Sequence, residues 1–341
     1  MAQSGSGGAI YTAIVANALI TVAKFVGYLM SGSGSMLAEA IHSVADVGNQ
    51  TLLAIGLSRA SRPADEAYPD GYGREAFVWA LISAVGIFFL GCGATVLHGL
   101  ESLKNAEHHE MAGSGVAVGI LLVSLLLEGW SGVVALRVTS AHARERGIGV
   151  LAHLRTTDDP FELAILLEDS AAMFGILVAL SAIGLARFTG QTFWDPIGSI
   201  LIGGLLGSVA VALIRLNRGL LVGRAVGQDE RAKIADVLSS DPAIDAVGRL
   251  SATVQGTEAY AVKAGIDFNG HYLAEQVLAG RDLDAELASL RSGADLRAYL
   301  GDYSEVLLDV LGDQVDRIEG RVREAVRRAQ HMDLEPERSE R

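Results

Sequence analysis

The stretch "AEAIHSVADVGNQ", residues 38–50, decides how this sequence is interpreted, because it carries polar side chains inside an apolar helical pattern. The polar residues are Glu39, His42, Asp46, Asn49 and Gln50. His42 and Asp46 are four residues apart, so they share one face of a helix with the rest of this stripe. If the surrounding chain spans a membrane, the stripe cannot face lipid and instead lines a polar pathway or pairs with other polar groups.

The composition indicates a membrane protein. Half of the 341 residues are hydrophobic, and 40 are glycine. A helix needs about 20 apolar residues to cross about 30 Å of hydrocarbon. Six stretches of this length are expected to span the bilayer, at about residues 9–30, 36–57, 76–100, 112–136, 161–186 and 194–214. No basic residue precedes the first stretch and no cleavage site follows it, so we expect it to stay as a span.

The basic residues predict the orientation, because Lys and Arg concentrate in cytoplasmic loops. Three connections are rich in arginine: those between spans two and three, between spans four and five, and after span six. These arginines are Arg59, Arg62, Arg74, Arg137, Arg144, Arg146, Arg155, Arg215, Arg218 and Arg224. We therefore predict a multi-pass integral membrane protein with both termini in the cytoplasm. The chain looks bacterial, so the plasma membrane is expected, with an organellar membrane as the alternative.

The composition becomes polar and acidic after about residue 223, which predicts a second domain. We expect a six-span transmembrane domain at residues 1–222 and a cytoplasmic dimerisation domain at residues 223–341, with a helical insertion near residues 274–310. The formal net charge of -13 disfavours nucleic acid as a partner. The single cysteine, Cys92, cannot form a disulfide within the chain.

The polar residues at membrane depth suggest a metal site. A neutral imidazole and a carboxylate one turn apart, such as His42 and Asp46, can both reach a divalent cation. Two further predicted spans add Glu128, Glu168 and Asp169. One histidine with several carboxylates suits zinc, or the harder manganese or iron. The alternative is a His/Asp pair that only bridges helices.

Several motifs resemble the cation diffusion facilitator family, whose members export divalent metals from the cytoplasm or into organelles. They are "SGSGSMLAEAIHSVADVGNQ" (31–50), "RPADEAYPDGYGREAFVWALI" (62–82) and "DPIGSILIGGLLG" (195–207). Two others, "AVGIFFLGCG" (84–93) and "AILLEDSAAMFG" (164–175), are similar to the branch that includes the mitochondrial zinc transporter of animals. The resemblance implies a homodimer of six-span protomers in the lipid bilayer. Each protomer would carry a metallochaperone-like αββα domain and exchange metal for protons by alternating access, without an organic cofactor.

The resemblance also implies the ligands. The family's first pair falls on His42 and Asp46, and the Asp of its second pair falls on Asp169. The His of the second pair falls on Ile165, which cannot bind a metal.

The fourth ligand is therefore open among Glu168, Glu128, Glu39 and water. Glu168 lies about 100° around an ideal helix from Asp169, so direct ligation and a helix-bridging or proton-carrying role both stay open. His331 and Asp333 are secondary candidates, because a strand at this place binds metal in some relatives.

The sequence thus predicts an exporter that exchanges Zn²⁺ for protons. Because carboxylate oxygen replaces a histidine nitrogen, Mn²⁺, Fe²⁺ and Co²⁺ are alternative substrates. The rival interpretation is a non-transporting metal sensor or partner protein of the same fold, which the isoleucine at position 165 keeps open. An enzyme is not expected, because no protease or phosphatase motif surrounds Asp46 or Asp169.

Overall fold

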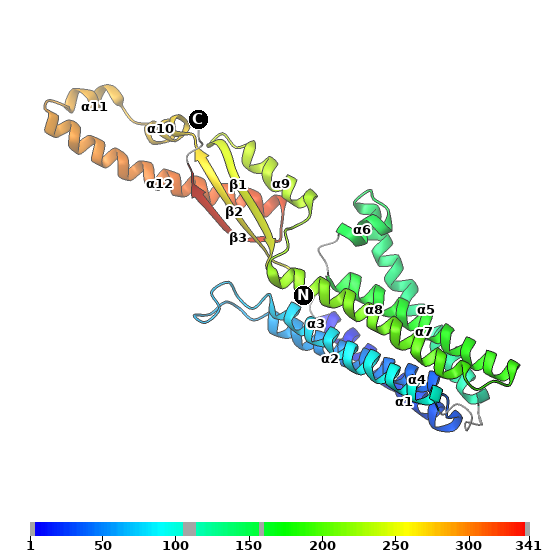
Figure 1. The fold of residues 1–341 in the computed structure, drawn as a ribbon. Helices are drawn as coiled ribbons and strands as arrows, with labels where there is room; N and C mark the ends of the chain where they lie inside the picture. Colours follow the sequence, from blue (N-terminus) through cyan, green and yellow to red (C-terminus); the bar gives the residue numbers. More distant parts are fainter. Residues whose placement is uncertain (1–3, 105–113, 157–159, 338–341) are drawn as a thin grey trace. The chain divides into compact units, whose positions relative to one another are not determined.

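The computed structural model describes residues 4–104, 114–156 and 160–337. The chain divides into two compact units, Met1–Val222 and Gly223–Arg341. Long helices make up the first unit, whereas the second combines helices with a small β-sheet (Figure 1). The predicted fold class, a membrane helical domain followed by a small α+β domain, is confirmed.

Six helical segments of spanning length form the described part of the first unit. They are α1 (Ser4–Ser31), α2 (Gly34–Ala60), the continuous run of α3 (Glu75–Gly86), η1 (Ile87–Ala94) and α4 (Thr95–Lys104), α5 (Ser114–Glu145), α7 (Pro160–Thr189) and α8 (Trp194–Val222). A short helix, α6 (Val150–Thr156), connects α5 to α7. The predicted start of the fourth span, residue 112, lies outside the described residues.

Four of these segments are long and apolar enough to cross a membrane by length and composition. They are Glu75–Lys104, Gly115–Glu145, Glu162–Thr189 and Trp194–Val222. In α1, the described apolar helix is the shorter Asn17–Ser31. Helix α2 has 27 residues but is not one of these four, because its polar stripe lowers its hydropathy. The helix that carries the candidate site is thus the least suited to face lipid.

Helix α2 lies inside the first unit and contacts α1, α3, α7 and α8. Its Met36 belongs to a buried apolar cluster with Leu121 of α5, Ile176 of α7 and Ile202 of α8. By contrast, large side chains elsewhere are exposed, as in Phe188 at 92%. Exposed apolar side chains are expected where hydrocarbon surrounds the helices. Polar side chains such as those of the α2 stripe then face the interior of the bundle.

A buried ion-pair network joins three helices. Lys24 Nζ of α1 lies 3.0 Å from Glu39 Oε2 of α2 and 2.8 Å from Glu128 Oε1 of α5. The side chains of Lys24 and Glu39 are fully buried. A Cβ at position 175 of α7 would collide with Glu39 Oε1, so Gly175 gives that carboxylate its space. Because a buried charge is costly without a partner, this network fixes α1, α2 and α5 against one another.

The beginning of α2 is held by a carboxylate from α8. Asp195 accepts hydrogen bonds from Ser33 Oγ at 2.6 Å, from the Gly34 N–H at 2.5 Å and from the Ser35 N–H at 3.2 Å. A carboxylate at a helix N-terminus satisfies otherwise unpaired N–H groups and interacts favourably with the helix dipole. Gly32, with φ of 67°, supplies the left-handed residue that lets the chain turn from α1 into this contact.

The second unit contains a three-stranded sheet of order β1-β2-β3. Its elements are α9 (Gln228–Ser239), β1 (Ile244–Val254), β2 (Tyr260–Phe268), α10 (Gly270–Leu278), α11 (Leu283–Ser289), α12 (Gly293–Ala325) and β3 (Ala329–Pro336). β2 pairs antiparallel with β1 and parallel with β3. The region of the predicted insertion contains the end of α10, α11 and the first half of α12, which continues as one helix to Ala325.

An ion pair connects α12 to the turn after α9. The buried Asp241 carboxylate accepts hydrogen bonds from Arg317 Nη2 at 2.7 Å and from Arg321. Burial tends to raise the pKa of Asp241, but the hydrogen bonds from the two guanidinium groups outweigh it and hold the pKa below its ordinary value.

The network around Lys24 predicts the effect of removing its cation. Lys24→Met leaves Glu39 and Glu128 without the partner that they share, which is expected to destabilise the folded protein by about 3–5 kcal/mol. The measurement is the Tm of the purified protein in detergent. The control is Lys104→Met, because that lysine is exposed at the end of α4. An unchanged Tm in Lys24→Met would contradict this role of the network.

The contact at Asp195 generates a second prediction. Asp195→Asn keeps one acceptor oxygen but turns an amide NH₂ group toward donors, and is expected to destabilise the protein by about 1.5–3 kcal/mol. Ser199→Ala is the matched control in the same helix, because the buried Ser199 hydroxyl has no hydrogen-bond partner among the described residues. Equal Tm values for the two variants would show that the carboxylate does not hold α2.

Candidate metal centre

His42 and Asp46 lie one turn apart on α2, with His42 Nε2 3.6 Å from Asp46 Oδ2. The His42 side chain is 3% exposed and that of Asp46 is 19% exposed. Within the described residues, neither ring nitrogen of His42 has a hydrogen-bond partner. Buried polar atoms are normally hydrogen-bonded, so an imidazole without such bonds next to a carboxylate is a candidate for ligand binding.

Glu168 and Asp169 of α7 point to different neighbours. Glu168 Oε2 accepts a hydrogen bond of 2.6 Å from Asn49 Nδ2 of α2, whereas Asp169 Oδ2 accepts one of 3.1 Å from Ser131 Oγ of α5. This divergence follows from the turn of about 100° between consecutive helical residues. Asp46 interacts electrostatically with both acids. Asp46, which lies beside His42 on α2, is therefore near both acids of α7.

The structure does not bring the four side chains to mutual ligating distance. Across residues 4–104, 114–156 and 160–337, no three of their donor atoms lie together within 4.8 Å. Glu168 Oε1 is buried and has no hydrogen-bond partner among those residues, so this oxygen is available to bind a cation. Ile165, one turn before Asp169, has 48% of its surface exposed.

The two more distant acids have another partner. Glu39 and Glu128 both form ion pairs with Lys24, which supplies the positive charge that a metal would otherwise provide. In this arrangement they hold helices together, and one oxygen of each carboxylate is engaged by Lys24. Their remaining oxygens, Glu39 Oε1 and Glu128 Oε2, are buried without a hydrogen bond within the described residues.

Asn49 of the polar stripe connects three helices, a role that the sequence did not indicate. Asn49 donates to Glu168, and its Oδ1 accepts a hydrogen bond of 2.6 Å from Ser83 Oγ of α3. Asn49 thereby joins α2, α3 and α7 and orients the Glu168 carboxylate. Its place in the polar stripe was the signal that could have indicated this.

The secondary candidates on β3 lie on one face of the strand, two residues apart. Asp333 Oδ2 lies 3.0 Å from Lys263 Nζ of β2, and the two side chains are 46% and 70% exposed. His331 pairs in register with Ala261. Among the described residues, neither His331 nor Asp333 belongs to a group of three close metal-binding side chains.

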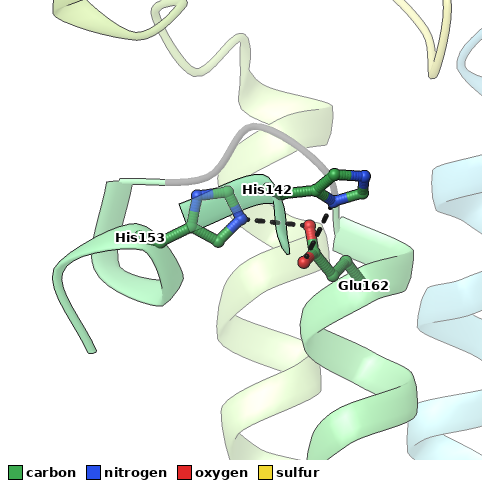
Figure 2. A group of neighbouring side chains, drawn as sticks. All are labelled: His142, His153 and Glu162. Carbon is green, nitrogen blue, oxygen red and sulfur yellow. Dashed lines mark hydrogen bonds and ion pairs between the residues drawn. The ribbon is translucent and has the colours of Figure 1, made fainter. Parts of the chain in front are cut away.

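Sequence reasoning missed a different group, which lies where α5, α6 and α7 meet. His142, His153 and Glu162 place one donor atom each within 4.8 Å of the others (Figure 2). The three are 11 and 9 positions apart, and a turn at Gly147 separates the first two, so no helical or strand periodicity links them. Because the chain has only 8 histidines, examining each one in the arginine-rich connections could have found the group.

Comparison with known proteins gives a consistent result. A family model described as the cation efflux transmembrane domain matches residues 10–222. Metal tolerance protein C4 of Arabidopsis thaliana is 37% identical over 334 residues, which are 96% of this chain and 72% of that protein. Proteins named mitochondrial proton-coupled zinc antiporter SLC30A9 are 34% identical over 98% of this chain in Xenopus laevis and 33% identical over 97% in Homo sapiens.

This chain spans 60% of the Xenopus laevis relative and 58% of the human one. The expected bacterial plasma membrane gains no support, because these relatives are named mitochondrial. The family model covers most of the helical unit, including the polar stripe and both acids of α7. The chain therefore belongs to the cation diffusion facilitator family, in the branch of the mitochondrial zinc antiporters of animals.

Proposed function

We propose that this chain transports Zn²⁺ across a membrane in exchange for protons, with His42, Asp46, Asp169 and Glu168 as the metal-binding side chains. The observation that carries the proposal is the buried His42, whose ring nitrogens lack hydrogen bonds within the described residues and lie beside Asp46. The acids of α7 complete a polar region inside a helical bundle. Such a group of ionisable side chains at membrane depth is typical of a pathway for ions.

The proposed coupling follows from the chemistry of the ligands. Metal binding requires a neutral imidazole and ionised carboxylates, so protons compete with the cation for the same atoms. When the site opens to the side with more protons, His42 and Asp46 become protonated and release the metal. Asp46 is the more exposed member of the pair, with 19% of its side chain exposed against 3% for His42, and in this proposal it is the group that an entering cation meets first. Alternating exposure of one site to the two sides then gives antiport.

The substrate and assembly are further parts of the proposal. The matched animal relatives are named proton-coupled zinc antiporters, which supports zinc, proton coupling and transport rather than enzymatic activity. A set of one nitrogen and several oxygens is harder than a typical zinc site, so Mn²⁺, Fe²⁺ and Co²⁺ are the alternative substrates. The proposed transporter is a homodimer with cytoplasmic termini, the orientation that the arginine-rich connections support.

Metal flux into proteoliposomes under an imposed pH gradient tests the proposal. Asp46→Ala and His42→Ala each remove a ligand and are expected to lower Zn²⁺ flux by more than about tenfold. The matched control is Val44→Ala, an exposed residue of α2 between the two ligands, which is expected to keep the flux of the unmodified protein. Folding is checked by the elution profile of each variant in detergent.

Normal Zn²⁺ flux through a folded Asp46→Ala protein would defeat the assignment of the site. If the unmodified, folded protein moves none of Zn²⁺, Mn²⁺, Fe²⁺ and Co²⁺, the rival function gains support. In that case the chain is a metal sensor or a partner of another transporter.

A second variant tests the departure at position 165. Ile165→His places an imidazole one turn before Asp169, where the two side chains can share a cation in the way proposed for His42 and Asp46. A softer ligand set is expected to shift the flux ratio toward Zn²⁺ and away from Mn²⁺. Competition assays with both metals in one vesicle preparation measure that ratio, and an unchanged ratio would show that position 165 does not face the site.

A further inference from the structure

Three connected elements bring a second set of metal-binding side chains together, outside the proposed transport site. His142 lies near the end of α5, His153 lies on α6, and Glu162 lies in the first turn of α7. In Figure 2 both imidazole rings point toward the Glu162 carboxylate. His142 Nδ1 lies 3.4 Å from Glu162 Oε1, and His153 Nε2 lies 3.2 Å from Glu162 Oε2.

These separations fit ligands around a tetrahedral cation. Nitrogen and oxygen atoms bound to zinc at about 2.0–2.1 Å lie about 3.3–3.4 Å from one another at the corners of a tetrahedron. A hydrogen bond between a charged imidazolium and a carboxylate would be shorter, at about 2.7–2.9 Å. Each histidine faces a different oxygen of Glu162, and both distances are longer than in a contracted ion pair and close to the separation of two ligands on one cation.

Two of the three side chains are buried and the third is half exposed. The side chains of His153 and Glu162 are 5% and 10% exposed, whereas that of His142 is 50% exposed. Thr139 hydrogen-bonds the Glu162 carboxylate and helps to orient it. Two ligands are thus held by the fold and the third is reached from the surface. Three protein ligands leave a fourth corner of the tetrahedron for water.

We propose that His142, His153 and Glu162 form a second binding site for a divalent transition metal, with Zn²⁺ as its preferred ion. Two imidazoles and one carboxylate are softer than the single imidazole and acids of the transport site. This donor set favours Zn²⁺ or Co²⁺ over Mn²⁺. The site lies in the arginine-rich connection that is predicted to face the cytoplasm.

One neighbour must move when the metal binds. Arg146 Nη1 lies 3.5 Å from His153 Nδ1, while a cation bound at Nε2 requires the ring proton to be at Nδ1. The Arg146 side chain is exposed, so it can turn toward solvent. A bound cation would then cross-link α5, α6 and α7, three elements otherwise joined here by side-chain hydrogen bonds.

The test is a Co²⁺ and Zn²⁺ binding titration of the purified full-length chain. Visible absorption reports on tetrahedral Co²⁺, and equilibrium dialysis counts the bound Zn²⁺. His142→Ala is expected to remove one bound metal per chain or to weaken its binding by at least about tenfold. Because His142 is half exposed, this variant is expected to fold. His153→Gln is a second variant that keeps a hydrogen-bonding group at the buried position.

Two controls make the result specific. His271→Ala changes an exposed histidine of the other unit and is expected to leave the count unchanged. Both ligand variants are also measured in an Asp46→Ala background. If His142→Ala removes one further bound metal per chain there, that metal belongs to the second site, whatever happens at the proposed transport site. An unchanged number and affinity of bound metals in folded His142→Ala and His153→Gln proteins would overturn the proposal.

Discussion

The cost of placing charge inside a membrane bundle governs the arrangement of the first unit. An unpaired ammonium or carboxylate at this depth is highly unfavourable, so Lys24, Glu39 and Glu128 are stable there only as a group. Because these residues come from α1, α2 and α5, their pairing sets the positions of three helices. The glycine at position 175 lets α7 approach the same carboxylate closely. The bundle thus forms around a compensated charge as well as around apolar contacts.

Because of this pairing, some residues of the α2 polar stripe hold helices together and others are left for the proposed metal site. Glu39 is neutralised by Lys24, and Asn49 is occupied by Glu168 and Ser83, so both hold helices together. His42 and Asp46 lie between them on the stripe and are held by neither contact. Because the neighbouring contacts hold the helices, His42 can face Asp46 while its ring nitrogens make no hydrogen bond within the described residues. The availability of His42 and Asp46 for a cation therefore depends on the contacts of Glu39 and Asn49 as well as on the pair itself.

Local patterns in the sequence predicted much of this arrangement. The spacing within residues 38–50 gave the polar face of α2, and hydrophobic length gave the helical class of the first unit. The divergence of Glu168 and Asp169 followed from helical geometry alone. The partner of Glu128 did not follow, because Lys24 is 104 positions away and only packing brings them together.

The group of His142, His153 and Glu162 did not follow from the sequence for the same reason, since it depends on how α5, α6 and α7 pack together.

Helix α7 links the two proposed metal centres. Glu162 and Asp169 are seven residues apart on one helix, a rise of about 10 Å. A helix moves as a rigid element over such a length, so a displacement of α7 that changes access to Asp169 also moves Glu162 relative to His142. A cation held by all three residues of the second site favours the position of α7 in which they meet. If both proposed centres bind metal, linkage through α7 would make the affinity of one centre depend on occupancy of the other.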